Sequence, residues 1–214
     1  MLKCKSIAYG FHSNVRRVFL IITHNWTTAS PPFRVLDSSV IGIPSPHSLR
    51  ADQFPGIRIG DDPIIGSYCV LFSNVFIGNN FRCGNRVFIR DGTSIGDNVS
   101  LGDMCFIDTG VSIGNGVTIR ENVRVPSSTT IGDKVCVGPN VTFTSEPSYP
   151  GCRRNKSSGV IFEDGCVIGA NVVMGAGVCV GAGARIAPGT TVTHTVPPNV
   201  HASGSPMRFQ MIAD

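Results

Sequence analysis

Apolar residues recur at every sixth position over most of the chain. This column holds fifteen consecutive apolar residues between Ile59 and Phe143, and it resumes one residue out of phase from Phe162 to Val192. Two companion columns share the period. The residue after the apolar position is often Gly, and the residue four positions after it is mostly small or β-branched. Such a unit predicts a short strand followed by a tight turn, repeated as an array.

Three six-residue units predict one triangular coil, and stacked coils would pair their strands in parallel about 4.8 Å apart. The apolar column would fill the interior, and Gly would tolerate the positive φ that a sharp corner demands. About seven stacked coils bury a core that one coil cannot bury alone. We therefore predict an all-β fold, a parallel β-helix over residues 57–195. A non-repeat N-terminal extension (1–56) precedes it, and a C-terminal tail (196–214) follows.

One corner of the predicted coil differs from the other two, because every third post-apolar residue is not Gly: Phe72, Arg90, Asp108, Pro126 and Thr144. The 18-residue spacing would stack Arg90 on Asp108 within reach of a surface ion pair, which contributes little to stability. An insertion at residues 145–159 leaves from this corner. It makes the step from Phe143 to Phe162 nineteen residues long where six would serve, so thirteen are extra. Long loops in compact arrays are more often functional than accidental.

The first 56 residues lack the repeat. Residues 15–26 predict one apolar element, a strand or a short helix, and residues 29–47 are rich in Pro and Ser and predict mainly loop. We expect this extension to cap the unpaired strand edges at the end of the array. Its apolar run at residues 18–22 is too short for a secretory or transmembrane segment, so we expect no membrane span.

Composition narrows the functional classes. Charged residues make up 15% of the chain and the net charge is +4, with no concentrated basic face, so we expect no nucleic-acid partner. Four of the eight cysteines fall in the buried columns and are interpreted as free thiols: Cys69, Cys83, Cys105 and Cys166. Free thiols favour a reducing, cytoplasmic compartment. The cysteines show no metal-ligand spacing such as Cys-x-x-Cys, and we expect no metal.

The units of the form [LIV]-G-x-x-[small]-x resemble the left-handed parallel β-helix of the hexapeptide-repeat acyltransferases. The resemblance covers about residues 57–208. It supplies the handedness, since ordinary parallel crossovers are right-handed. It implies a homotrimer whose active sites lie between neighbouring subunits. It also implies transfer of an acyl group from a coenzyme A thioester, with acetyl-CoA as the cosubstrate.

The C-terminal ending, TVTHTVPPNVHASGSPMRF, is similar to the VTKDxPPxxxxxGxPxR ending of that family. In the family, this ending and the coil before it hold coenzyme A. The resemblance implies that five residues contact the coenzyme here: Ala170, Pro188, Thr193, His194 and Arg208. Two of them depart from the family pattern, because Pro188 has no backbone N–H to donate and His194 replaces a Lys.

The loop entry, Phe-Thr-Ser-Glu-Pro at residues 143–147, resembles that of nucleotide-linked amino-sugar N-acetyltransferases, which read Phe-Thr-Asn-Asp followed by Tyr-Pro or a similar pair. Galactoside and maltose O-acetyltransferases instead place a catalytic His before a Pro. The resemblance implies substrate contacts by Ser145 and Tyr149. Arg153 and Arg154 in the same loop are candidate anion contacts, and the alternative is a solvated basic loop.

The chemistry of the acceptor favours an amine. A hydroxyl generally needs a base such as His during attack, whereas a neutral amine is already nucleophilic and needs mainly positioning. No His lies between Phe54 and Thr193. Glu146 is the leading candidate for the catalytic carboxylate, with a loop-surface Glu as the alternative, and Asp108 is the second candidate. We therefore predict transfer of an acetyl group from acetyl-CoA to the amino group of a nucleotide-linked amino sugar.

Two other functions stay open. O-acetylation of a sugar or another small hydroxylated acceptor would need an N-terminal His such as His24 or His47 to reach the site. A non-enzymatic solenoid scaffold is the alternative from another class. A γ-class carbonic anhydrase is excluded because the coils offer no set of three His ligands for zinc. A sugar nucleotidyltransferase would need a larger N-terminal domain than 56 residues.

Overall fold

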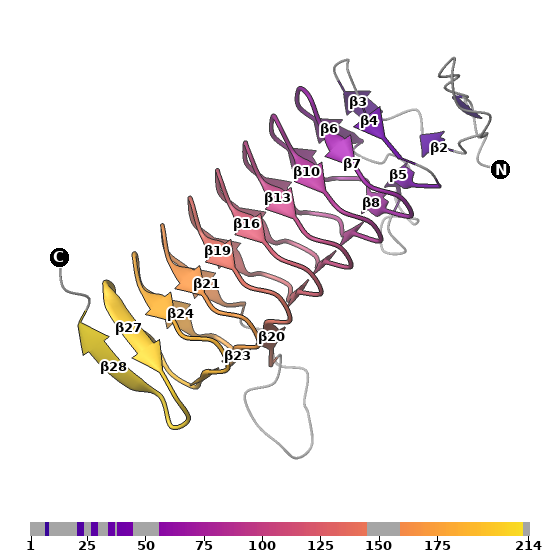
Figure 1. Cartoon of the computed structure of the whole chain (residues 1–214). Helices are drawn as coiled ribbons and strands as arrows, with labels where there is room; N and C mark the ends of the chain where they lie inside the picture. The colour runs from indigo at the N-terminus through magenta and orange to yellow at the C-terminus, as the bar shows by residue number, and fades with distance from the viewer. Residues whose placement is uncertain are drawn as a thin grey trace.

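The computed structural model describes residues 7–8, 21–23, 27–29, 34–36, 38–44, 56–144 and 159–211. In these ranges all regular structure is β-strand, and the strands form a parallel solenoid of about seven turns that matches a left-handed β-helix. The coils follow one another in a single row from the N-terminal to the C-terminal end (Figure 1). No helix in the described residues could cross a membrane. The predicted fold class is confirmed.

Four sheets form the faces of the solenoid. The first contains, in spatial order, β1 (Ile7–Ala8), β2 (Ile21–Thr23), β5 (Val40–Ile43), β8 (Val70–Phe72), β11 (Phe88–Ile89), β14 (Phe106–Ile107) and β17 (Arg124–Val125). The second contains β28 (Arg208–Met211), β27 (Val200–Ser203), β25 (Arg185–Ile186), β22 (Val167–Ile168), β19 (Cys136–Val137), β16 (Thr118–Ile119), β13 (Ser100–Leu101), β10 (Arg82–Cys83), β7 (Ile64–Ile65) and β4 (Arg34–Val35).

The third sheet contains β24 (Cys179–Val180), β21 (Ile161–Phe162), β18 (Thr130–Ile131), β15 (Ser112–Ile113), β12 (Ser94–Ile95), β9 (Phe76–Ile77), β6 (Ile57–Ile59) and β3 (Thr27–Ala29). The fourth contains β20 (Thr142–Phe143), β23 (Val173–Met174) and β26 (Thr191–Val192). It continues the face of the first sheet after a break.

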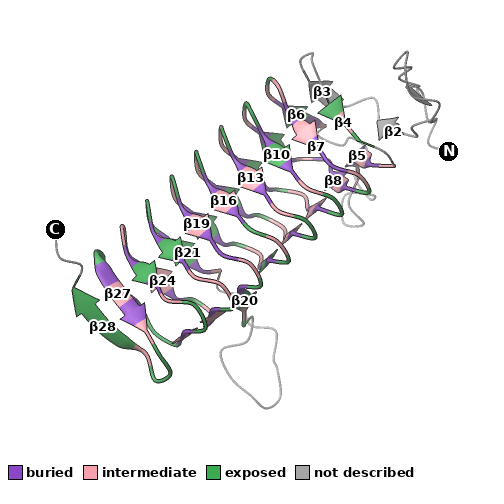
Figure 2. Cartoon of the chain, viewed as in Figure 1, coloured by how far each residue is buried: buried purple, intermediate pink, exposed green. Residues whose placement is uncertain are grey.

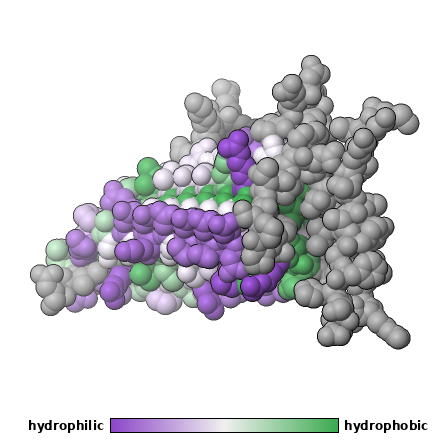
Figure 3. Space-filling view, turned by 90° about the horizontal axis from the view of Figure 1, so that it is seen from above, coloured by the Kyte–Doolittle hydropathy of each residue, from purple (hydrophilic) through white to green (hydrophobic). Residues whose placement is uncertain are grey.

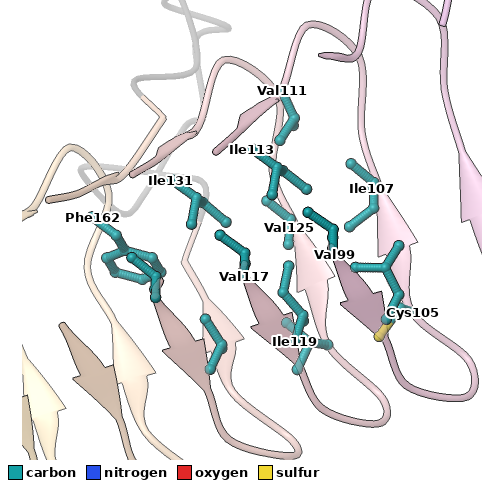
Figure 4. Close-up of a cluster of buried hydrophobic side chains, with 14 of the residues drawn as sticks. Val99, Cys105, Ile107, Val111, Ile113, Val117, Ile119, Val125, Ile131 and Phe162 are labelled. Carbon is teal, nitrogen blue, oxygen red and sulfur yellow. The ribbon is translucent and has the colours of Figure 1, made fainter. Parts of the chain in front are cut away.

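The core is the predicted apolar column. Strands one coil apart pair in parallel, as where Ile89 lies opposite Ile107 in β11 and β14. Their inward side chains are completely buried. Buried positions recur along the coils in Figure 2. The column runs through the middle of the coils, with the small-residue column beside it (Figure 4). Each coil therefore buries its apolar side chains against its neighbours, and the array needs no other core.

The reason for Gly at the position after each apolar residue differs from the predicted one. Gly78 does not have a positive φ. A Cβ on it would instead lie 2.7 Å from the Gly96 carbonyl carbon and 2.8 Å from the Asp97 nitrogen. The positive φ falls two positions later, for example at Asn80 (φ 55°), where Asn and Gly tolerate it best. The post-apolar Gly thus leaves room for the next coil, and the expectation of positive φ at that position is wrong.

A ladder of Asn and Asp side chains runs along the corner between the third and second sheets. The Asn79 N–H donates to Asp97 Oδ1 (2.6 Å), and the Asp97 N–H donates to Asn115 Oδ1 (2.9 Å) in the next coil. The same bond repeats as far as Asp164. Each side chain satisfies a turn N–H that would otherwise lack a partner. Figure 3 shows rows of hydrophilic residues and rows of hydrophobic residues running along the solenoid.

Pro126 divides one face of the solenoid into two sheets. In the coil before it, the Asp108 N–H donates to the Val125 carbonyl (3.0 Å). Pro126 occupies the next position in that column and has no N–H to donate, so the ladder stops. The first sheet accordingly ends at β17, and β20 begins the fourth. The other two faces continue past this point, with β16 paired to β19 and β18 paired to β21.

Strands within the N-terminal segment extend the solenoid. β3, β4 and β5 pair in parallel with β6, β7 and β8, and the residues opposite Ile59, Ile65 and Leu71 are six apart: Ala29, Val35 and Ile41. The expectation of mainly loop over residues 29–47 is therefore wrong at β4 and β5. β2 falls in the predicted apolar element and extends the first sheet past β5 as a strand. The boundary at residue 56 stays a prediction.

The tail ends the array with a hairpin. β27 pairs in parallel with β25, and β28 turns back antiparallel on β27. This agrees with the expectation that the tail forms a short-strand segment along the solenoid. The hairpin covers the last strand edge of the second sheet, which would otherwise present unpaired backbone groups.

The predicted thiols are buried and free. Burial raises the pKa of the Cys166 thiol from 9.0 to about 12, and burial also raises the pKa of Cys105. A hydrogen bond from Cys83 lowers the pKa of Cys69 to about 7, while the contact with Cys69 raises that of Cys83. Three of the four thiols therefore stay protonated in the folded chain above pH 9, where unfolded thiols ionise.

We expect stability to fall as pH rises from 9 towards 12. A raised folded-state pKa contributes stability that is complete below the unfolded value and is lost as pH approaches the folded one. Denaturant midpoints measured from pH 8 to 11 check this, and Cys166→Val should reduce the slope because Val is common in that column. An identical slope in Cys166→Val would contradict the role of this thiol.

Candidate active site

The inserted loop leaves and re-enters the solenoid at anchored positions. The Thr144 N–H donates to the Met174 carbonyl (2.8 Å), and the Val160 N–H donates to Thr129 Oγ1 (3.4 Å). β18 and β21 on the return side stay in register, with Thr130 opposite Ile161. The insertion thus replaces only the turn at this corner, and the coils on either side are undisturbed.

The predicted catalytic and substrate-binding residues of the loop lie outside the described residues: Ser145, Glu146, Tyr149, Arg153 and Arg154. Their roles stay predictions. The structure places the loop base, at Thr144, on the corner that the sequence singled out. The last described strand before the insertion is β20 (Figure 1).

Asp108 lies on the same corner, two coils before Thr144. Its Oδ1 accepts hydrogen bonds from Arg90 Nη1 (3.0 Å) and the Thr109 N–H (2.8 Å), and its Oδ2 lies 3.5 Å from Arg124 Nη2. The predicted Arg90–Asp108 pair is confirmed. The Asp108 side chain is only 17% exposed, and both of its oxygens contact cations. This arrangement suits a carboxylate that holds the corner together better than one that accepts a proton from a substrate.

A stack of aromatic side chains on the outer face of the first sheet contacts the ion-pair cluster of Arg90, Asp108 and Arg124. The rings of Phe88 and Phe106 lie parallel with centroids 5.0 Å apart, and Phe72 packs at 5.2 Å on Phe88. The Arg124 guanidinium caps the stack 4.1 Å from the Phe106 centroid, within cation–π range. Arg124 is therefore held by both Phe106 and Asp108.

Ala170 and Pro188, two predicted coenzyme contacts, stack at the corner between the second and fourth sheets. The Gly189 N–H donates to the Ala170 carbonyl (2.9 Å). The first two turns of this corner are satisfied by the next coil, where the Ser67 N–H donates to Asn85 Oδ1 (2.9 Å) and the Asn85 N–H donates to Asp103 Oδ1 (2.6 Å). Pro188 offers no such acceptor. Within the described residues, the Ala170 N–H has no acceptor and is available to a bound carbonyl.

Thr193 and His194 lie at the opposite edge of the fourth sheet, on the corner that carries the loop. Thr193 Oγ1 lies 3.1 Å from His194 Nδ1, and the His194 ring meets the edge of Phe209 at 5.7 Å. Phe209 and the exposed Arg208 belong to β28. The structure thus gathers Thr193, His194 and the tail hairpin at one edge of this sheet, with Ala170 and Pro188 at the other.

His194 has a placement that sequence reasoning missed. The column of this corner runs through Thr144, Gly175 and Thr193, because the Thr144 and Gly175 N–H groups donate to the Met174 and Val192 carbonyls. An exposed imidazole therefore lies on the loop-bearing corner, two coils beyond the loop base. Removing the thirteen inserted residues from the count aligns Thr193 with Thr144 and would have shown this position.

Family models match the coils that build these corners. The model described as hexapeptide repeat of succinyl-transferase matches residues 92–127 and 159–194, and the bacterial transferase hexapeptide model (six repeats) matches residues 110–145. Residues 92–145 and 159–194 thus carry the hexapeptide repeat of these transferases. No curated protein matches this chain significantly.

Two solved structures illustrate the relationship. A hexapeptide-repeat acetyltransferase of Vibrio cholerae O1 biovar eltor, solved with acetyl coenzyme A, is 28% identical over 57% of this chain and 72% of its own, with a TM-score of 0.51. The polySia-specific acetyltransferase NeuO is 19% identical over 89% of this chain and 90% of its own, with a TM-score of 0.54. The second similarity concerns the fold of the acyltransferase alone.

Replacing Ala170 by proline should weaken acetyl-CoA binding by about tenfold, which corresponds to one lost hydrogen bond of about 1.4 kcal/mol. The substitution removes the unpaired N–H and should keep the corner intact, because Pro139 and Pro188 occupy this position in the neighbouring coils. Calorimetric titration with acetyl-CoA measures the effect. Asn171→Gly, at the neighbouring positive-φ position (56°), is the control and should bind as the parent does. Equal affinity in Ala170→Pro would contradict the assignment.

Proposed function

We propose that this acyltransferase moves an acetyl group from acetyl-CoA to the amino group of a nucleotide-linked amino sugar. The acetyl-CoA complex of the Vibrio cholerae structure supports the donor. The unpaired Ala170 N–H and the hairpin beside His194 support a coenzyme site on the fourth sheet. The observation that carries the acceptor class is the anchored loop at Thr144. Its sequence has Glu146 where an O-acetyltransferase would have a His.

The proposed reaction needs a positioned amine and a proton acceptor. The neutral amine attacks the thioester carbonyl carbon, so a C–N bond forms and the C–S bond breaks. Glu146 accepts the proton that the amine loses, and the departing sulfur leaves as the thiol of coenzyme A once it is protonated. Positioning supplies much of the rate in such a reaction, since it turns a bimolecular encounter into an effectively unimolecular step.

A second candidate is O-acetylation with His194 as the base. The observation that favours it is the position of His194 on the loop-bearing corner, oriented by Thr193 Oγ1. An imidazole there can remove the proton of a hydroxyl nucleophile during attack. The N-terminal His24 and His47 lie outside the described residues and stay predictions for the same role.

Thiol release from acetyl-CoA tests the two functions. We expect turnover with nucleotide-linked amino sugars and none with the matching sugars that carry a hydroxyl in place of the amine. His194→Ala should then weaken acetyl-CoA binding without abolishing turnover. Turnover restricted to hydroxylated acceptors, and lost in His194→Ala, would establish the second candidate instead. No turnover and no thermal shift with acetyl-CoA would favour a scaffold.

We further propose a cytoplasmic homotrimer with sites between subunits. The proposal rests on the resemblance to the family and on the free thiols. Sedimentation measures the mass of the assembly, which should be that of three chains. Mixing an inactive Glu146→Gln variant with Ala170→Pro, at acetyl-CoA concentrations too low to saturate Ala170→Pro, tests the shared site, because trimers reassembled from both contain some interfaces with two intact partners. Recovered activity is expected, and its absence would place Glu146 and Ala170 of one subunit in the same site.

A further inference from the structure

One corner of the solenoid carries large side chains where the backbone disfavours them. Fourteen non-glycine residues in the described chain have positive φ, and half of them are Asn. Three of the large exceptions occupy consecutive coils of the corner that joins β7, β10 and β13 to β8, β11 and β14 (Figure 1). They are Tyr68 (59°), Arg86 (57°) and Met104 (57°). A bulky residue in this region is an outlier, and such outliers cluster at functional sites.

The later coils show what this corner accepts without strain. The equivalent residues in the next three coils are Asn122, Asn140 and Asn171. Asn tolerates positive φ because its short polar side chain bonds locally. The turn geometry therefore does not require Tyr, Arg or Met at the three earlier positions. Tyr68 is 58% exposed and Met104 is 51% exposed, so the solenoid core does not require them either.

The three side chains border a hollow of about 370 Å³ that is open to solvent. Ser67, Asn85 and Asp103 line the rest of it. The hollow extends over three coils, a span of about 10 Å at the strand spacing of a sheet. Its volume falls in the range of ligand sites. It lies on the N-terminal coils, away from the fourth sheet and the loop base.

The chemistry of the lining indicates a sugar with a negative charge. Tyr68 and Met104 offer apolar surface at the two ends, and Asn85 and Asp103 offer side-chain partners for hydroxyl groups. Arg86 lies between them, and its guanidinium forms no ion pair within the described part of the chain. A guanidinium recognises a carboxylate through two parallel hydrogen bonds.

Other ligand classes fit less well. The N–H groups of Arg86 and Met104 donate to the carbonyls of Ser67 and Asn85 (both 2.8 Å), and the Asn85 N–H donates to Asp103 Oδ1 (2.6 Å). These groups cannot form the cradle of N–H donors that binds nucleotide phosphates. A peptide strand would need an open sheet edge, whereas this corner lies between two sheets whose strands are paired with neighbouring coils.

We propose that this corner binds a carboxylated saccharide chain and anchors it to the solenoid outside the acetyl-transfer site. Arg86 binds a sugar carboxylate, Tyr68 and Met104 pack on the sugar rings, and Asn85 and Asp103 bind hydroxyls. The proposal does not depend on the acetyl-transfer reaction, since binding requires neither acetyl-CoA nor the loop.

The test uses oligogalacturonate as the probe and a neutral galacto-oligosaccharide of the same length as its counterpart. The key variant replaces Tyr68, Arg86 and Met104 by Asn, the residue that later coils use. We expect the parent to bind oligogalacturonate in calorimetry and the triple variant to bind at least tenfold more weakly. Its thermal midpoint should be equal or higher, because Asn relieves the backbone strain. Acetyl transfer to a small acceptor should be unchanged.

Arg86→Asn alone should remove the preference for the charged probe over the neutral one. The proposal is overturned if the parent fails to bind oligogalacturonate or if the triple variant binds it equally. Equal binding of the neutral probe by the parent would overturn the charge assignment. A change in oligomeric state in the triple variant, without an effect on probe binding, would assign the corner to a subunit contact instead.

Discussion

Replacing Glu146 by glutamine is expected to lower kcat with an amino-sugar acceptor by about 10²- to 10⁴-fold, the range typical of a lost general base. The amide cannot accept the ammonium proton, while its similar size should leave acetyl-CoA binding unchanged. The variant should therefore keep its Km for acetyl-CoA and lose turnover. Steady-state thiol release at saturating donor measures both quantities.

Glu163→Gln provides the matched control for this substitution. The Glu163 carboxylate accepts the Ala182 N–H (2.9 Å), and a Gln carbonyl can keep that bond. The control removes the same charge from a neighbouring coil and should retain activity. If Glu146→Gln keeps most of its kcat, or if both variants lose it equally, Glu146 is not the base. A residual rate of Glu146→Gln that does not change with pH would further indicate that the variant has lost a base and has kept its fold.

Replacing Gly78 by alanine is expected to destabilise the chain by about 3 kcal/mol, at the upper end of overpacking effects. The added Cβ would contact the Gly96 carbonyl carbon and the Asp97 nitrogen of the next coil at under 3 Å. Both are backbone atoms of a paired coil and cannot move aside as a flexible side chain can. It would also meet the Asp97 carboxylate, which accepts the Asn79 N–H. Urea unfolding followed by circular dichroism measures the loss.

Gly110→Asn is the control for Gly78→Ala. Gly110 has a positive φ of 69°, and a Cβ on it would meet nothing within 4 Å. Asn tolerates this conformation, so the control should change stability by less than about 1 kcal/mol. Equal destabilisation in both variants would mean that the close approach of coils does not explain the Gly column.

The interior could be predicted from the sequence because every coil offers the same environment to its apolar residue. Ile89 and Ile107 lie opposite each other in the same setting, so a single period describes them all. The ion pair between Arg90 and Asp108 followed from the same period. The corners were harder to predict because their contacts join residues of different coils. Asn79 and Asp97 resemble ordinary surface residues until the 18-residue spacing pairs them.

Features that interrupt the period were the ones missed. Val35 in β4 and Ile41 in β5 keep the six-residue spacing, but eighteen residues separate Ile41 from Ile59 where six would serve, so the repeat was not followed back across this interval. Pro126 appeared as one member of a corner column, and the bond that its missing N–H fails to form would have joined it to Phe143 in the following coil, as the Asp108 N–H joins Val125. His194 was assigned to coenzyme binding from the tail motif, and its place on the loop-bearing corner depends on an alignment across the insertion.

The parts of the candidate site that carry a sequence motif could be predicted, and the parts formed by contacts between coils could not. The loop is recognisable because it interrupts the repeat, and the tail because the repeat ends there. The unpaired Ala170 N–H could not be recognised from residue 170 itself. It arises because Pro188, one coil later, lacks the side-chain acceptor that Asn85 supplies to Ser67 in an earlier coil.

The break at Pro126 has a consequence for how the chain opens. Beyond it, the C-terminal coils are joined to the rest by two strand ladders in place of three. Coils in a solenoid depend mainly on their neighbours, so partial opening begins at the junction with fewest bonds. Amide hydrogen exchange should therefore show a boundary at Pro126. The amides of the C-terminal coils should exchange together and faster than those of the N-terminal coils. Acetyl-CoA would slow that exchange by binding only the closed form, so the donor would itself complete the fold of the coils that hold it.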